Sequence, residues 1–322
     1  MGAVKDYVVR HFRHFNSATV VDAARAWEEL LARGGRMFLS MGGAMSTAEL
    51  GTVLAELIRR DKLHAMCVTG ANLEEDVFNL VARSEYRRLP AYRELSPQDE
   101  KALYDQGFSR VTDTCIPEEA AMRKIESHML ELWRAAESGG ERHAPHEYLY
   151  RLLRSDVLRS QYQSDPRDSW MLAAAQRNLP LFVPGWEDST LGNFFVASVI
   201  RGRLRGHTAV KSGLEQMQEL VQWYRAIDSE HRVGFFQIGG GISGDFPICV
   251  VPLITKDLKW PVKTWSYFCQ ISEAQTSFGS YSGAPPTEKI TWGKLELDTP
   301  RFVIESDATV VFPLIAGYLL DA

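Results

Sequence analysis

The chain has 322 residues, of which 45% are hydrophobic and 24% are charged, a composition typical of an ordered protein with a large core. A formal net charge of −5 without a long basic run argues against nucleic acid as a partner. No segment reaches the roughly 18 apolar residues that span a bilayer, and the N-terminus lacks the apolar region of a signal peptide, so we expect a cytoplasmic protein without a membrane partner.

Short apolar runs alternate with amphipathic segments in the first part of the chain, which is the pattern of strands and helices in turn. The pattern Ser46-x-x-Glu49 fits a capping box at the start of a helix. The expected elements in chain order are a helical extension over 1–35, strands at 36–41 and 65–69, and helices at 50–57, 73–82 and 117–137.

Residues 136–168 are polar and contain Gly139-Gly140, Pro145 and Pro166, so we expect a loop-rich peripheral insertion there. His143 and His146 within it are expected to be surface residues. The four cysteines are far apart and form no spacing typical of a zinc site, and we expect neither a disulfide framework nor a bound metal.

The alternation resumes after this segment. It predicts an α/β, Rossmann-like fold with a mostly parallel central sheet flanked by helices, in a single large domain over 36–322. The remaining expected elements are strands at 180–184, 233–238, 265–271, 290–297 and 302–304, and helices at 191–200, 212–226 and 309–319.

Four glycine-rich or polar segments follow predicted strands, where ligands bind in an open parallel sheet. They are residues 41–47, 69–76, 188–193 and 239–245. The last contains Gly239-x-Gly241-x-x-Gly244, which has the spacing of a dinucleotide-binding loop, although a simple tight turn explains such glycines equally well.

Lys294 closes a turn-rich stretch that begins at Gly279. A lysine there acts as a nucleophile if burial against Trp292 keeps its amine uncharged, because only the free amine attacks carbon. The pattern alone favours a solvated lysine at a strand end over a catalytic one. In the same way, Glu74-Glu75-Asp76 by itself fits the acidic first turn of a helix.

The string from Ser282 to Lys294, Ser-Gly-Ala-Pro-Pro-Thr-Glu-Lys-Ile-Thr-Trp-Gly-Lys, resembles the late signature of the deoxyhypusine synthase family. The resemblance extends over about residues 36–320, with further matches at residues 74–76, 188–192, 239–241, 307–308 and 311–314.

This resemblance implies an NAD-dependent enzyme that oxidises spermidine, holds the aminobutyl group as an imine on a lysine, and passes it to an acceptor amine. It implies a homotetramer, with Lys294 as the nucleophile. The implied substrate-binding residues are Glu75, Asn193, Tyr281, Ser282, Glu288 and Trp292. The resemblance and the strand-end segments together assign the NAD site to Gly43, Thr47, Asp188, Thr190, Gly239, Gly240, Gly241, Ala274, Asp307 and Ala308.

Three positions depart from the family pattern. Asp245 stands where the family carries a histidine base, and it can act as a base itself or bind an ammonium group. Tyr281 and Asn193 replace two acids that bind spermidine in the family. We therefore expect a small diamine acceptor such as putrescine, as in homospermidine synthesis. The alternatives are modification of a lysine on translation initiation factor 5A, or binding of NAD and polyamine without turnover.

Overall fold

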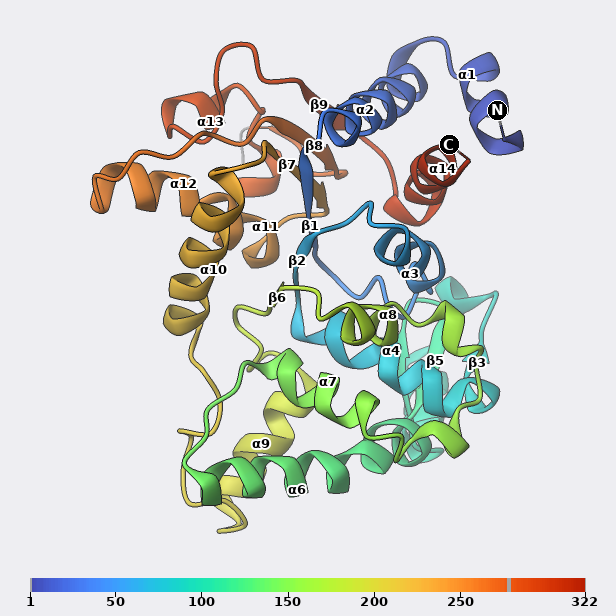
Figure 1. Ribbon diagram of the computed structural model, residues 1–322. Helices are drawn as coiled ribbons and strands as arrows, with labels where there is room; N and C mark the ends of the chain where they lie inside the picture. Colours follow the sequence, from blue (N-terminus) through green and yellow to red (C-terminus); the bar gives the residue numbers. More distant parts are fainter. Residues whose placement is uncertain (1, 277–278, 322) are drawn as a thin grey trace.

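A parallel sheet of six strands forms the centre of the protein (Figure 1). The computed structural model describes residues 2–276 and 279–321. The strand order is β6-β2-β1-β7-β8-β9, and every pairing in this sheet is parallel. The strands are β1 (Arg36–Met41), β2 (Ala65–Val68), β6 (Leu181–Phe182), β7 (Val233–Ile238), β8 (Tyr267–Ile271) and β9 (Arg301–Ile304). The α/β fold with a parallel central sheet is thereby confirmed.

Apolar side chains on both faces of the sheet explain why these short runs form inner strands. Phe38, Phe235 and Phe268 are paired in register across β1, β7 and β8 and are fully buried. Their rings stack with centroids 5.7 and 6.0 Å apart. A slip of one residue would turn this row of rings to the other face, so the row specifies the register.

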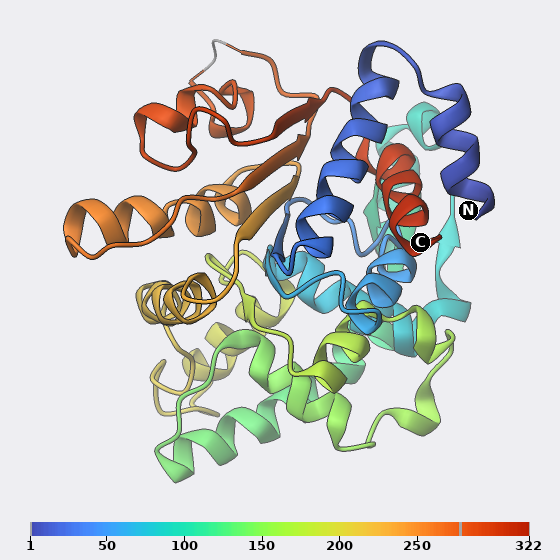
Figure 2. The ribbon, with the colours of Figure 1, turned by 45° about the horizontal axis from the view of Figure 1, so that its top comes forward.

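Helices cover both faces of the sheet, as Figure 2 shows. One face packs against α2, α3 and α14, and the other packs against α10, α11 and α12. The helices are α1 (Ala3–His11), α2 (Phe15–Ala32), α3 (Gly51–Arg59), α4 (Gly70–Ala82), α5 (Pro97–Asp105), α6 (Lys124–Gly139), α7 (Pro145–Arg154), α8 (Trp170–Arg177), α9 (Thr190–Ile200), α10 (Gly213–Asp228), α11 (Ile242–Ile248), α12 (Val250–Pro252), α13 (Glu288–Thr291) and α14 (Ala308–Leu320).

A small antiparallel sheet lies apart from the central one, with the strand order β3-β5-β4. Its strands are β3 (Arg87–Arg88), β4 (Phe108–Val111) and β5 (Thr114–Pro117). In the part of the chain that the structure describes, no helix has the length and apolar character to cross a membrane.

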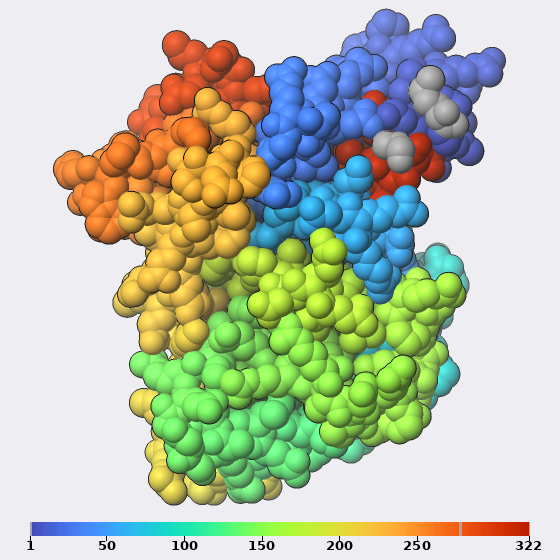
Figure 3. Space-filling model, in the orientation of Figure 1, coloured from blue at the N-terminus to red at the C-terminus, as the bar shows by residue number. Residues whose placement is uncertain are grey.

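The two ends of the chain meet on one side of the sheet. Trp27 of α2 is buried with its ring 4.9 Å from that of Phe236 in β7. The Asp321 carboxylate accepts hydrogen bonds from the backbone amides of Val4 and Lys5, at 2.7 and 3.0 Å. In the space-filling view α1 and α14 accordingly form one continuous surface (Figure 3). The helical N-terminus is thus part of the layer that covers the sheet.

The prediction of a loop-rich insertion over 136–168 is wrong for its central part. Residues 145–154 form α7, and Tyr148 is fully buried with its hydroxyl donating to Ala209 O at 2.7 Å. The Glu147 carboxylate accepts from Ala144 N at 2.6 Å and caps this helix, with Pro145 in its first turn. The flanking prolines and glycines therefore punctuate a helix whose apolar face is in the core.

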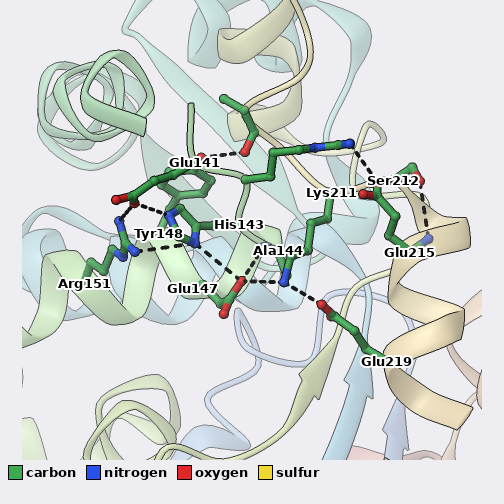
Figure 4. A network of polar contacts seen from close by, with 12 residues as sticks. Glu141, His143, Ala144, Glu147, Tyr148, Arg151, Lys211, Ser212, Glu215 and Glu219 are labelled. Carbon is green, nitrogen blue, oxygen red and sulfur yellow. Dashed lines mark hydrogen bonds and ion pairs between the residues drawn. The ribbon is translucent and has the colours of Figure 1, made fainter. Parts of the chain in front are cut away.

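A polar network ties the start of α7 to the start of α10 (Figure 4). His143 lies 2.8 Å from Glu141, while Lys211 lies 2.5 Å from Glu219 and 3.5 Å from Glu147. His143 is only partly exposed. The nearby His146 has a buried Nδ1 without a partner, and burial lowers its pKa to about 4. The expectation that both histidines are surface residues is therefore wrong.

Candidate active site

The strand order places a topological switch point between β1 and β7, because the chain runs from β1 outward to β6 and then returns to the opposite side of β1. In such sheets a crevice opens at the carboxyl ends of the two strands. The four predicted strand-end segments follow β1, β2, β6 and β7, so they all lie at this edge.

These segments are bonded to one another. The Thr69 hydroxyl donates to Gly43 O at 2.7 Å. The Asn72 side-chain amide donates to the carbonyl oxygens of Met41, Gly42 and Gly43, at distances of 2.9 to 3.2 Å. The loop after β1 is thus held rigidly by the start of α4. Asn72 is fully buried, and the sequence pattern did not single it out.

The loops after β1 and β7, which we call the glycine loops, approach each other closely. A Cβ atom on Gly42 would be 3.0 Å from Gly240 O, and one on Gly240 would be 1.7 Å from Ser282 Oγ. Gly239 and Gly241 have positive φ angles of 73° and 64°, which favour glycine. The close approach requires these glycines, and a loop without side chains is what a dinucleotide pyrophosphate needs beside it. The residues therefore fit NAD.

Two of the three acids on α4 cap other helices. Glu74 accepts from the backbone amides of Thr190 and Leu191, both at 2.7 Å, at the start of α9. Asp76 accepts from Ser169 Oγ at 2.5 Å, at the start of α8. Burial raises the pKa of Glu74 to about 7 and that of Asp76 to about 6. Since α4 begins at Gly70, the acids do not form its first turn, and that interpretation is wrong.

Glu75 differs from its neighbours because its one hydrogen bond comes from a hydroxyl. Thr47 Oγ1 donates to Glu75 Oε2 at 2.5 Å, and burial raises the pKa of Glu75 to about 7. Thr47 and Asp307 both line a cleft of about 730 Å³, which we call the Thr47 cleft. Asp307 also caps α14 by accepting from Thr309 N at 2.8 Å. The structure thus brings Thr47, assigned to the cofactor, together with Glu75, assigned to substrate.

The Ser46-x-x-Glu49 pattern does not form the predicted capping box. Ser46 Oγ donates to Asn72 O at 2.7 Å, and α3 begins only at Gly51. Glu49 has a positive φ of 57°, outside helical geometry. Ser46 therefore fastens the loop to α4, a contact between distant residues that a local pattern cannot reveal.

A second cleft of about 630 Å³, the Lys294 cleft, holds the predicted nucleophile. Lys294 is 6% exposed, and its Nζ lies 3.4 Å from Asp245 Oδ1. The amine also lies 5.6 Å from the ring centroid of Tyr281 and 5.7 Å from that of Trp292. The lining of this cleft includes Asp245, Cys249, Tyr281, Glu288, Lys289, Trp292 and Lys294.

The predicted strand over 290–297 is wrong. Glu288–Thr291 forms the short helix α13. Gly293 N donates to Ile290 O and Lys294 N to Lys289 O, at 2.9 and 3.0 Å, with Gly293 at a positive φ of 70°. These bonds end the helix and turn Lys294 inward. β-Branched Ile290 and Thr291 imitate a strand locally, but Lys294 lies after a helical turn.

Lys289 is a functional candidate that sequence reasoning missed. It is 3% exposed, and its Nζ has no hydrogen-bond partner. The amine lies 4.7 Å from the ring centroid of Phe268 and 4.9 Å from that of Tyr281. Burial, followed by the charge of Lys294, lowers its pKa to about 8. If the segment after Pro286 had been predicted as a helix, Lys289 and Trp292, which are three residues apart, would have been expected on the same side of it.

Tyr281 and Ser282 join the Lys294 cleft to the glycine loop after β7. The Tyr281 hydroxyl donates to Gln237 Oε1 at 2.7 Å, and Gln237 Nε2 donates to Gly239 O at 2.8 Å. Gly241 N donates to Ser282 Oγ at 3.2 Å. The proposed nucleophile and the proposed cofactor loop are therefore parts of one connected edge of the sheet.

Other predicted site residues lie outside both clefts. Asp188, Asn193 and Ala274 are exposed, and none of them lines the Thr47 cleft or the Lys294 cleft. Thr190 directs its backbone amide to Glu74. Ala308 is buried at the start of α14. Among residues 2–276 and 279–321, no group of three or more potential metal ligands gathers.

One family model matches the chain over residues 8–319, and it is described as deoxyhypusine synthase. The "Probable deoxyhypusine synthase 2" of Methanosarcina acetivorans is 26% identical over 306 residues, which cover 95% of this chain and 83% of that protein. The "Deoxyhypusine synthase-like protein" of Nostoc sp. is 26% identical over 326 residues, which cover 99% of this chain and 82% of that protein. The crystal structure of a "putative deoxyhypusine synthase" from Entamoeba histolytica has a TM-score of 0.59 at 13% identity, covering 97% of this chain and 90% of that one, and supports the fold.

Proposed function

Because the chain belongs to the deoxyhypusine synthase family, whose members transfer aminobutyl groups, we propose that it is an NAD-dependent transferase acting on spermidine or a related polyamine. The observation that carries this proposal is the buried amine of Lys294 in a cleft that adjoins the glycine loop after β7. A lysine nucleophile needs shelter from water, and this position provides it.

The glycine loops after β1 and β7 would hold the cofactor. Gly42, Gly43 and Gly239–Gly241 would face its pyrophosphate, and Thr47 and Asp307 would lie along the neighbouring cleft. NAD, when bound, supplies an acceptor for the hydride of the donor amine.

The residues of the Lys294 cleft would bind the amine substrate and hold its aminobutyl group. The Lys294 nitrogen attacks the oxidised carbon of the donor, and departure of the diamine fragment leaves the aminobutyl group as an imine on Lys294. Asp245 can act as a base or bind an ammonium group. Its Oδ1 lies 3.4 Å from Lys294 Nζ, which favours the second role, a carboxylate that binds and orients Lys294. Trp292, at 57% exposure, offers a flat apolar surface to the methylenes of a polyamine.

We propose a small diamine such as putrescine as the acceptor. Tyr281, which lines the Lys294 cleft, is neutral where the family carries an acid, which changes the amines that the site prefers. Glu288, exposed at the rim of the Lys294 cleft, would bind the distal ammonium of this acceptor.

We also propose a homotetramer, as the family resemblance implies. Ile242 and Val310 are large apolar residues that are exposed by 53 and 62%, and another copy of the chain would cover them. Sedimentation equilibrium tests this directly, and a monomer would contradict it.

Borohydride trapping tests the enzyme. The protein is incubated with NAD and spermidine, reduced with borohydride, digested and examined by mass spectrometry, with the Lys294→Arg variant as the control. An aminobutyl adduct on Lys294 is expected. Its absence in the wild type would point to binding without turnover. Putrescine and translation initiation factor 5A, supplied as competing acceptors, then distinguish homospermidine synthesis from protein modification.

A further inference from the structure

Lys289 has a buried amine without a counter-ion. Its Nζ is enclosed by the rings of Phe268 and Tyr281, and it makes no hydrogen bond. A charged ammonium in such surroundings loses its hydration without compensation, so the group tends to give up its proton. A lysine of this kind is a base near neutral pH, whereas an exposed lysine is not.

Lys289 and Lys294 face the same aromatic ring. Their Nζ atoms lie 4.9 and 5.6 Å from the ring centroid of Tyr281, and a backbone hydrogen bond of 3.0 Å joins Lys294 N to Lys289 O. Both side chains line the Lys294 cleft. The two amines are therefore electrostatically coupled, and the charge of Lys294 disfavours a charge on Lys289.

The surroundings of the two amines are unequal. Asp245 forms an ion pair with Lys294 at 3.4 Å, whereas the Lys289 amine has no hydrogen-bond partner. Burial raises the pKa of the Cys249 thiol, so this thiol is a poor proton acceptor at neutral pH. Several other titratable groups surround the pair. They are Asp245 of α11, Cys249 directly after α11, Tyr281 before α13, Glu288 at the start of α13, and Cys67 of β2 near Tyr281.

We propose that Lys289 is the proton acceptor of this site and takes up the proton that Lys294 must lose before it attacks. The inference rests on the proposed function. Lys289 would then be the base of this chain. Asp245 replaces the family's histidine and instead forms an ion pair with Lys294.

The proton balance is simple. The Lys294 ammonium becomes an amine as the Lys289 amine becomes an ammonium. The Lys294 nitrogen then forms a bond to the iminium carbon of the oxidised donor. One proton on the attacking nitrogen passes to the departing nitrogen, whose bond to carbon breaks with its electron pair, so the diamine leaves as a neutral amine and the imine remains on Lys294 in its protonated form.

The test is the pH dependence of trapping on Lys294, measured for the wild type and for Lys289→Met, Lys289→Arg and the control Lys256→Met. Lys256 is exposed, with Nζ 6.0 Å from the Trp292 ring, and it does not line the Lys294 cleft. The wild type is expected to reach half of its maximal trapping rate near pH 8, the pKa of Lys289.

Both Lys289 variants are expected to trap about 100-fold more slowly at pH 7.5, the usual scale of general base catalysis, while Lys256→Met matches the wild type. Lys289→Arg separates the roles, because arginine keeps the positive charge but accepts no proton. Unchanged NAD binding and a single cooperative melting transition would show that the variants fold.

A wild-type rate in either Lys289 variant would overturn the inference, and so would an adduct on Lys289 in place of Lys294. If the wild type forms no adduct at all, the proposed function itself fails, and the two failures are thus distinguishable.

Discussion

Replacing Lys289 by methionine should stabilise the protein at neutral pH, and by less as the pH rises. The pKa of Lys289 is lowered from 10.5 to about 8, mainly by burial. Each unit of pKa difference is worth about 1.4 kcal/mol, so the folded protein carries a charge penalty of about 3 kcal/mol at pH 7. Methionine fills a similar volume between the two rings without that charge.

The sign follows from proton binding. Between pH 8 and 10.5 the unfolded chain holds the Lys289 proton and the folded protein does not, so wild-type stability rises with pH in that window. From pH 7 to pH 9.5 this rise amounts to about 2 kcal/mol, and Lys289→Met lacks it.

Urea unfolding of both proteins at pH 7 and pH 9.5 measures the effect. The difference in unfolding free energy between the variant and the wild type isolates Lys289 together with its coupling to Lys294, because groups remote from this site titrate alike in both. An advantage of the variant that stays constant across this range, or a variant that is less stable at pH 7, would refute the assignment of Lys289 as an unpaired buried amine.

Three further predictions concern the sheet edge. Gly240→Ala should abolish NAD binding in a fluorescence titration, because its Cβ would collide with Ser282 Oγ, whereas Gly206→Ala, with open space around its Cβ, should bind normally. Glu74→Ala should lower the unfolding free energy by about 1–2 kcal/mol, because the start of α9 loses its acceptor; equal urea midpoints would contradict this. The unfolding free energy of the wild type should fall as the pH rises from 5 to 7, because the folded state holds a proton on Glu75 that the unfolded state has released, and Glu75→Gln should lack this fall. Parallel stability profiles would exclude that role.

The order of strands and helices was largely predictable because it depends on local composition. Residues 36–41 and 233–238 are apolar runs of strand length, and each is followed by glycines. Once the strands are parallel, their carboxyl ends lie at one edge, so the four predicted loops had to converge there. The string ending at Lys294 was equally visible, since a signature is a matter of residue order.

Burial and partners were decided by contacts between residues far apart in the chain. Lys289 lies beside an acid in the sequence, and only the rings of Phe268 and Tyr281 make its amine unpaired and dry. Glu74 and Asp76 became helix caps only when α9 and α8 packed against α4. Local sequence thus determined the elements and the edge at which they present their loops. Tertiary packing decided which charges lie in water and which lie in a low dielectric, and that difference sets the chemistry available to the two lysines.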